Sequence, residues 1–152
     1  MIFFLAAALG VLIAFLIALP AILLEIDHRV KNAPLLIDVT VWRGLKLSRP
    51  EAFAAGLFLH LVVGGLYGLF YAIFAKQGWL VVTNAPYTLR SMLIFAVGSW
   101  LVLGNVLLPL IGLGWFGRRE GNTVWAETLM SLLLEGVVLW EVIKWYQPFF
   151  FG

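Results

Sequence analysis

The chain has 152 residues, of which 63% are hydrophobic and only 12% are charged. A soluble globular domain is about 45–50% apolar and about 25% charged, so this composition excludes a water-soluble protein. The net charge of +2 supplies no basic tract for nucleic acid, and the absence of cysteine excludes disulfides and thiolate metal sites. Membrane lipids are therefore the expected surroundings.

Four uninterrupted apolar stretches are each long enough to cross a bilayer, which requires about 20 residues per helix. They run over about residues 2–24, 52–75, 87–116 and 123–145. Because every backbone amide in lipid must find an internal partner, apolar runs of this length form helices. The sequence predicts a single all-α domain over residues 1–152, an integral membrane bundle of four transmembrane helices with an interfacial first loop.

The polar segments that flank the first two stretches refine this picture. Arg29 and Lys31 follow the first apolar core instead of preceding it, so we expect a retained anchor and not a cleaved signal peptide. Ser48 and Glu51 have the spacing of a helix capping box at the start of the second stretch.

The first loop, between Glu25 and Arg49, mixes apolar residues with Arg43 and Lys46, which suit anionic headgroups. We expect this loop to lie along the membrane surface. It is either a re-entrant packing loop that only links two helices or a docking site for a partner.

Basic residues are distributed unevenly between the loops, and the side richer in Lys and Arg normally faces the cytoplasm. The first and third loops hold Arg29, Lys31, Arg43, Lys46, Arg49, Arg118 and Arg119, whereas the opposite side holds Lys76, Arg90 and Lys144. We therefore expect a bacterial inner membrane protein with both termini on the non-cytoplasmic side.

Three polar side chains fall inside the predicted spans, where such groups are costly and usually face protein or water. They are His60 in the second stretch, Asn105 in the third and Glu135 near the middle of the fourth. At 1.5 Å rise per residue the three reach similar depths, so they are predicted to form one intramembrane polar layer. A contact between His60 and Glu135, supported by Asn105, is the central expectation. The alternative is that these groups only hold helices together.

Small residues recur at every fourth position of the second stretch, most closely from Gly56 through Gly64 to Gly68. This spacing lets another helix approach closely, so we predict a helix-packing stripe there. His60 is the one large residue within it. A glycine four residues before a membrane histidine also leaves room for a macrocycle, so His60 is a weaker candidate ligand for chlorophyll or haem. No other cofactor and no metal-ligand set is indicated.

Two short segments resemble a known group of proteins. His60-Leu-Val-Val-Gly64-Gly-Leu-Tyr67-Gly68 and Pro109-Leu-Ile-Gly112-Leu-Gly114-Trp-Phe116-Gly117 are similar to the YagU-like small four-helix bacterial membrane proteins of unknown function. The resemblance covers mainly the second and third helices, and it implies a fold and a polar position but no reaction. Those proteins tend to carry a histidine in the last helix, where this chain has Glu135.

Three classes of function remain open. The chain lacks a nucleophile constellation and a soluble catalytic domain, so we expect no enzyme activity. The packing stripe and the aromatic flanks favour a non-catalytic accessory or structural subunit of a larger membrane complex, or a homo-oligomer. One alternative is a small transporter or proton-handling protein that uses His60 and Glu135. The other is tetrapyrrole binding through His60.

Overall fold

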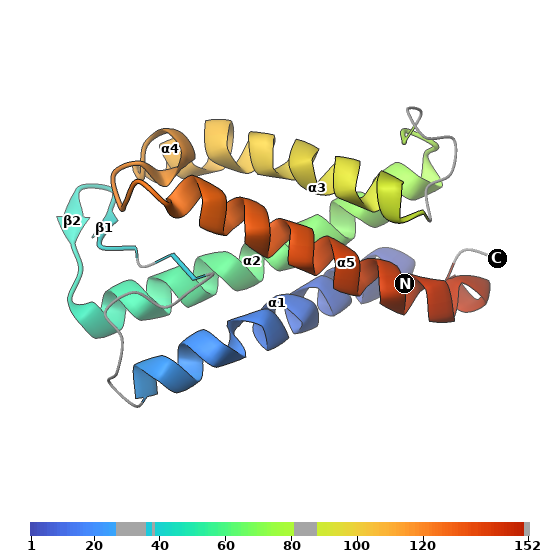
Figure 1. The fold of residues 1–152 in the computed structure, drawn as a ribbon, viewed down its shortest axis with the longest axis horizontal. Helices are drawn as coiled ribbons and strands as arrows, with labels where there is room; N and C mark the ends of the chain where they lie inside the picture. Colours follow the sequence, from blue (N-terminus) through green and yellow to red (C-terminus); the bar gives the residue numbers. More distant parts are fainter. Residues whose placement is uncertain (27–35, 38, 81–87, 151–152) are drawn as a thin grey trace.

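The computed structural model describes residues 1–26, 36–37, 39–80 and 88–150, and for residues 26 and 146–150 it describes the backbone only. Arg29, Lys31 and Tyr87 of the predicted loops and spans lie outside the described residues. The described chain is mostly helical (Figure 1). Its elements in order are α1 (Ile2–Ile26), β1 (Val41–Trp42), β2 (Leu45–Lys46), α2 (Arg49–Lys76), α3 (Leu89–Val102), a π-helical turn η1 (Leu103–Leu107), α4 (Leu108–Leu110), a 3-10 turn η2 (Trp115–Gly117) and α5 (Val124–Phe150).

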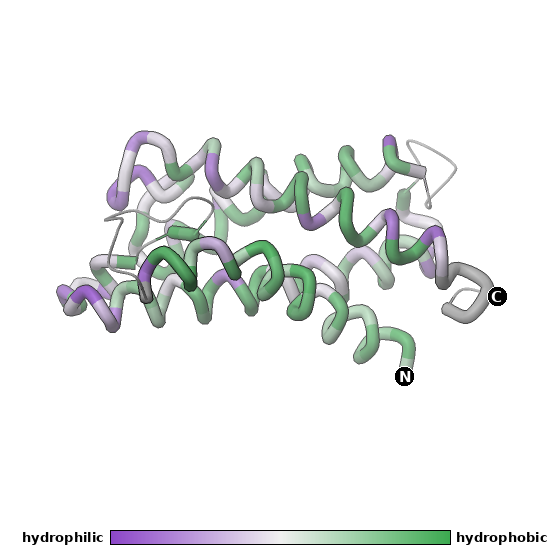
Figure 2. Tube along the Cα trace, turned by 60° about the horizontal axis from the view of Figure 1, so that its bottom comes forward, coloured by the Kyte–Doolittle hydropathy of each residue, from purple (hydrophilic) through white to green (hydrophobic). Residues whose placement is uncertain are grey.

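Among the described residues, three helices are long and apolar enough to cross a membrane, which is consistent with an integral membrane protein. They are Ile2–Glu25, Arg49–Gln77 and the continuous run Leu89–Leu110, which joins α3, η1 and α4. The helices are hydrophobic over most of their length, and hydrophilic residues gather toward the ends of the bundle (Figure 2). The predicted bundle is therefore confirmed in its helical class and in three of its spans.

Local signals explain where the second helix begins and where the third one ends. The predicted capping box is confirmed, because the Ser48 amide donates to Glu51 Oε2 at 2.7 Å, and α2 begins at Arg49. The third helix ends at Leu110, before the predicted limit at Phe116. Gly112 adopts a φ of 94°, and its amide and that of Leu113 bond back to the carbonyls of Pro109 and Leu108. This is a Schellman ending, in which a left-handed glycine stops the helix.

The helices pack as two pairs. α1 runs along α2, and α5 packs against both α3 and α1 (Figure 1). α2 and α3 are consecutive in the chain, and they contact each other through aromatic side chains, with Phe95 of α3 packed against Tyr67, Tyr71 and Phe74 of α2. The core between the pairs is built from buried aliphatic and aromatic side chains, with Tyr71, Met92 and Leu108 among the most completely buried.

The described part of the first loop forms a hairpin. β1 and β2 pair antiparallel, and Arg43 and Gly44 between them have φ values of 47° and 88°, as in a type I′ turn. Leu36 and Val39, just before the hairpin, are buried in the bundle. This part of the loop thus packs against the helices, while its position relative to a membrane surface stays a prediction.

The first and third loops lie at the same end of the bundle. The Thr40 hydroxyl donates to Glu120 Oε2 at 2.5 Å, and the Val41 amide donates to Glu120 Oε1 at 3.2 Å. The two termini lie toward the other end (Figure 1). Of the basic residues predicted to share one side of the membrane, the described ones share one end of the fold, namely Arg43, Lys46, Arg49, Arg118 and Arg119.

Candidate functional site

The glycines of α2 face α1 across a very close helix contact. A Cβ added to Gly68 would strike the carbonyl of Ala6, and one added to Gly64 would lie 2.9 Å from the carbonyl oxygen of Gly10. Gly64 and Gly68 of the predicted packing stripe are thus covered within the chain by α1, whereas Gly56 is buried and lines a small cavity beside His60. Gly10 was missed in the sequence, although Ala6, Gly10 and Ala14 repeat the four-residue spacing of α2.

This pairing bears on the accessory-subunit hypothesis, which assigned the stripe to a partner protein. Because α1 covers Gly64 and Gly68, that surface cannot also receive a partner helix. The hypothesis then rests on exposed aromatic residues such as Trp79, Trp115 and Trp145, which are 57%, 63% and 76% exposed. Such residues also occur at lipid interfaces without any partner. The accessory role stays a prediction.

His60 lies on α2, half-buried, and its ring bonds to α1. Its Nε2 is 2.9 Å from the carbonyl oxygen of Ala14. A carbonyl can only accept, so this nitrogen carries the hydrogen and leaves Nδ1 as the lone-pair nitrogen. A tetrapyrrole metal at Nε2 would have to break this bond. Tetrapyrrole ligation by His60 therefore gains no support from the geometry and stays a prediction.

Glu135 lies near the middle of α5 and is only 1% exposed. Its Oε1 has no hydrogen-bond partner among the described residues. This oxygen faces the bare backbone of α2, because a Cβ on Gly64 would lie 3.0 Å from it. Glycine at position 64 thus accommodates both α1 on one side and the carboxyl of Glu135 on another.

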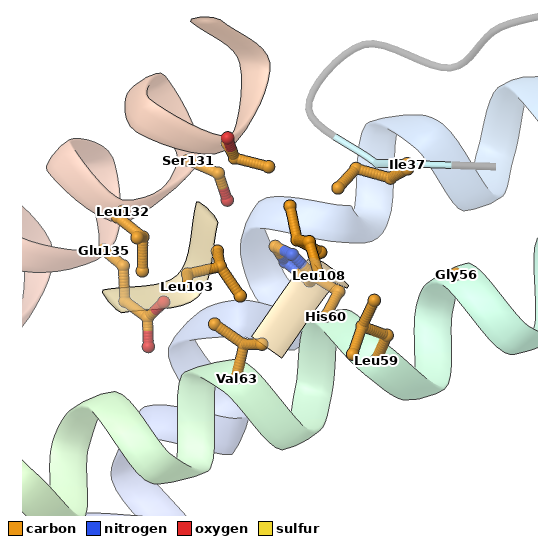
Figure 3. Close-up of a pocket in the computed structure, with 11 residues that line it drawn as sticks. Ile37, Gly56, Leu59, His60, Val63, Leu103, Leu108, Ser131, Leu132 and Glu135 are labelled. Atoms are coloured by element: carbon orange, nitrogen blue, oxygen red, sulfur yellow. The ribbon is translucent and has the colours of Figure 1, made fainter. Parts of the chain in front are cut away.

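A small cavity connects these groups. It has a volume of about 30 Å³ and is lined by four polar side chains, His60, Thr128, Ser131 and Glu135, among aliphatic ones. Figure 3 shows Ser131 and Glu135 projecting from α5 toward the space that His60 enters from α2. A site that holds a water needs at least about 10–15 Å³ and polar partners, so this cavity can hold one. No hydrogen bond joins His60 directly to Glu135 in the described structure, and their predicted contact stays a prediction.

Asn105 does not share this cavity. Its side-chain amide donates to the carbonyl of Leu101 at 2.8 Å, one turn back on its own helix. It lies within the π-helical turn Leu103–Leu107, four residues before Pro109, which has no amide hydrogen to donate. The structure gives Asn105 a local role in this irregular turn, and the support that it was expected to give His60 and Glu135 is not seen.

Tyr67 is a polar residue of the same interface that was not among the residues predicted to form the polar layer. It is 3% exposed, and its hydroxyl has no hydrogen-bond partner among the described residues. A Cβ on Gly136 would lie 2.7 Å from that hydroxyl oxygen, so Tyr67 reaches the backbone of α5 beside Glu135. The seven-residue spacing from His60 to Tyr67, two helical turns, was the available signal.

Two unpartnered oxygens therefore lie where α2 faces α5, and one of them, on Glu135, belongs to the water-sized cavity that His60 also lines. Such an arrangement can hold a water and can pass a proton between a carboxyl and that water. Comparison of the chain with protein families, curated proteins and solved structures found no match, so the similarity to YagU-like proteins stays a prediction.

Proposed function

We propose that this chain is a small polytopic membrane protein that handles protons through the carboxyl of Glu135. The observation that carries the proposal is the buried carboxyl with an unpartnered oxygen on the cavity that it shares with His60. The free-energy cost of burying an unpaired carboxylate is far larger than the stabilisation that a typical packing contact contributes. A group kept at such cost inside a membrane protein is most often kept for function.

The polar side chains of α5 indicate the side from which a proton would arrive. Thr128, Ser131 and Glu135 follow one another at three- and four-residue spacing, so they share one face of the helix. All three line the cavity, and Ile37 of the first loop lines it as well. The row extends from the end with the basic loops toward the middle of the bundle. We therefore place the access route at that end.

The proposal includes α5 as a fourth membrane-spanning helix. It has 27 residues, and it packs beside α1 and α3, two of the three apolar helices that are long enough to cross a membrane. Its central acid, Glu135, is turned into the bundle, while Val137 and Val138 are 38% and 37% exposed. An outward apolar face and an inward polar one suit a helix that borders both lipid and a functional cavity.

Proton flux into vesicles tests this function. The purified chain would be reconstituted into liposomes that contain a pH-sensitive dye, and a potassium diffusion potential would drive proton entry. We expect flux with the natural sequence and flux at the level of empty liposomes with Glu135→Gln, which keeps the shape but cannot ionise. Glu141→Gln is the matched control, because Glu141 lies on the same helix with its side chain 47% exposed, 3.8 Å from Lys144.

Equal flux from the Glu135→Gln variant and the natural chain would contradict the proposal. Flux at the empty-liposome level with the natural chain would also contradict it. In the second case, co-purification of a stoichiometric membrane partner would support the accessory role instead, and a visible absorption band would support tetrapyrrole binding.

A further inference from the structure

A large apolar groove lies between α2 and α3, beside the aromatic contacts that Phe95 makes with α2. Its volume is about 570 Å³, within the range of about 300–1,000 Å³ that is usual for ligand pockets. The floor is buried and includes Tyr67, Phe95 and Leu132, which are 3%, 8% and 3% exposed. The rims are exposed and belong to the two helices, with Phe70 on α2 and Val102 on α3 at 47% and 62% exposure.

The groove opens sideways at a depth where lipid surrounds the protein. Both of its walls belong to helices that are long and apolar enough to cross a membrane. An empty space of this size would forfeit the dispersion contacts of all its lining atoms, and water would be a poor filler for walls that are almost entirely apolar. A hydrocarbon chain is the occupant that matches both the surroundings and the walls.

A positively charged residue, Arg90, lies at the start of α3, near one end of the groove. Ile94, Gly98 and Val102 line the groove at four-residue spacing, and Arg90 lies one turn earlier on the same stripe of the helix. Arg90 is exposed. Trp79, which lines the groove from the α2 side at the same end, is 57% exposed, as expected for an interfacial aromatic. A guanidinium and an indole at one end of an apolar groove match the headgroup region of a phospholipid.

We propose that the groove between α2 and α3 binds one acyl chain of an anionic phospholipid, whose headgroup phosphate pairs with Arg90. The acyl chain lies between Phe70 and Ile94 and ends against Val63, Leu103 and Leu132. These three residues also form part of the wall of the Glu135 cavity. The site is separate from the proton-handling proposal, because lipid binding needs neither Glu135 nor His60.

Gly98 offers a direct way to fill the groove. A Cβ added there would meet no atom of the described residues within 4 Å, so a larger side chain can start into the groove without displacing the backbone. The protein would be reconstituted in vesicles of equal parts phosphatidylcholine and phosphatidylglycerol, extracted in mild detergent and examined by native mass spectrometry. The natural chain should retain one phosphatidylglycerol, and Gly98→Phe should reduce the lipid-bound fraction about tenfold.

Val97→Phe is the matched control, since Val97 is 41% exposed on the same helix but does not line the groove. It should retain the lipid. Arg90→Gln should keep a bound lipid but lose about fivefold in its preference for phosphatidylglycerol over phosphatidylcholine. Lys144→Gln removes a charge from α5 instead and should keep that preference.

Gly98→Leu serves as a smaller replacement in case the phenylalanine variant does not fold. Retention of lipid by either folded Gly98 variant at the natural level would overturn the proposal. Release of all lipid by the natural chain on extraction would overturn it too, as would a dimer that forms in place of lipid binding and is lost with Gly98→Phe.

Discussion

At the scale of single residues, the site is defined by oxygens that the fold buries without a bonding partner. Almost all buried polar groups in proteins are hydrogen-bonded, so each exception calls for an explanation. Glu135 Oε1 and the Tyr67 hydroxyl are two such exceptions where α2 faces α5. The other α5 carboxylates have local partners, since Glu127 accepts from Thr123 at 2.7 Å and Glu141 pairs with Lys144. Glu135 is thus the carboxylic acid of α5 whose presence is not explained by a local contact within the helix.

This difference leads to a prediction for Glu135→Leu. Leucine has a similar volume and removes the unpartnered carboxyl, so we expect the free energy of unfolding to stay unchanged or to rise by about 1 kcal/mol. Proton flux should be lost at the same time. Unfolding in mixed micelles, followed by circular dichroism, measures the first quantity. A loss of more than about 2 kcal/mol would instead assign Glu135 a structural role.

The same variant, combined with His60→Leu, tests the contact between the two residues. If a water in the cavity joins them, the two substitutions should be non-additive by about 0.5 kcal/mol or more. His60→Leu alone should cost about 0.5–1.5 kcal/mol, because it removes the bond to the Ala14 carbonyl. Strict additivity would show that the two side chains share a cavity without interacting.

At the scale of secondary structure elements, glycines allow two helices to approach closely in one place and leave open space in another. Gly10, Gly64 and Gly68 bring the backbones of α1 and α2 together, and Gly104 leaves room for the ring of Phe116 against the third helix. Gly98 has no such neighbour, and the groove lies beside it. Glycines in the apolar helices of this chain therefore have two different roles, since some permit tight helix packing and Gly98 borders an open groove.

Leucine substitutions at two of these glycines should separate the two roles. Gly64→Leu places a side chain against Ala14 and the Gly10 carbonyl, so we expect a loss of about 1–3 kcal/mol or more in the free energy of unfolding. Gly98→Leu is the matched control, and it should leave stability nearly unchanged. The midpoint of thermal unfolding in detergent checks both. Equal effects of the two variants would contradict the close helix contact.

At the scale of the whole molecule, the helices could be predicted from the sequence, but the way they pair could not. Apolar runs of the right length mark helices in lipid whatever their neighbours are, and the α2 glycines marked a packing surface. Nothing in the α2 pattern says that α1 covers it, because the same spacing would suit any helix. The packing of the first loop against the third depends on Glu120, a charged surface residue with no periodic signal.

The misplaced details also have local causes. The third apolar run continues past Leu110, so hydropathy alone extended the helix to Phe116, whereas the positive φ of Gly112 ends it earlier. Asn105 was assigned to the polar layer by depth, but depth does not fix the direction of a side chain, and the Leu101 carbonyl near the end of α3 supplies a nearer acceptor. The groove between α2 and α3 depends on how far apart the two helices lie beside their aromatic contacts, which the sequence of one helix does not determine.

The orientation of the whole bundle is the remaining prediction. Arg43, Lys46, Arg49, Arg118 and Arg119 lie at the end where the first and third loops meet, and Lys76, Arg90 and Lys144 belong to the other end. The positive-inside rule places the first end in the cytoplasm. A reporter fused after Gly152 should therefore be active on the non-cytoplasmic side, and one inserted after Gly121 should be active in the cytoplasm. Opposite sides for the two reporters require that α5 crosses the membrane. Reporters on the same side would show that α5 is not a fourth span, and exchanged sides would invert the orientation while keeping that span.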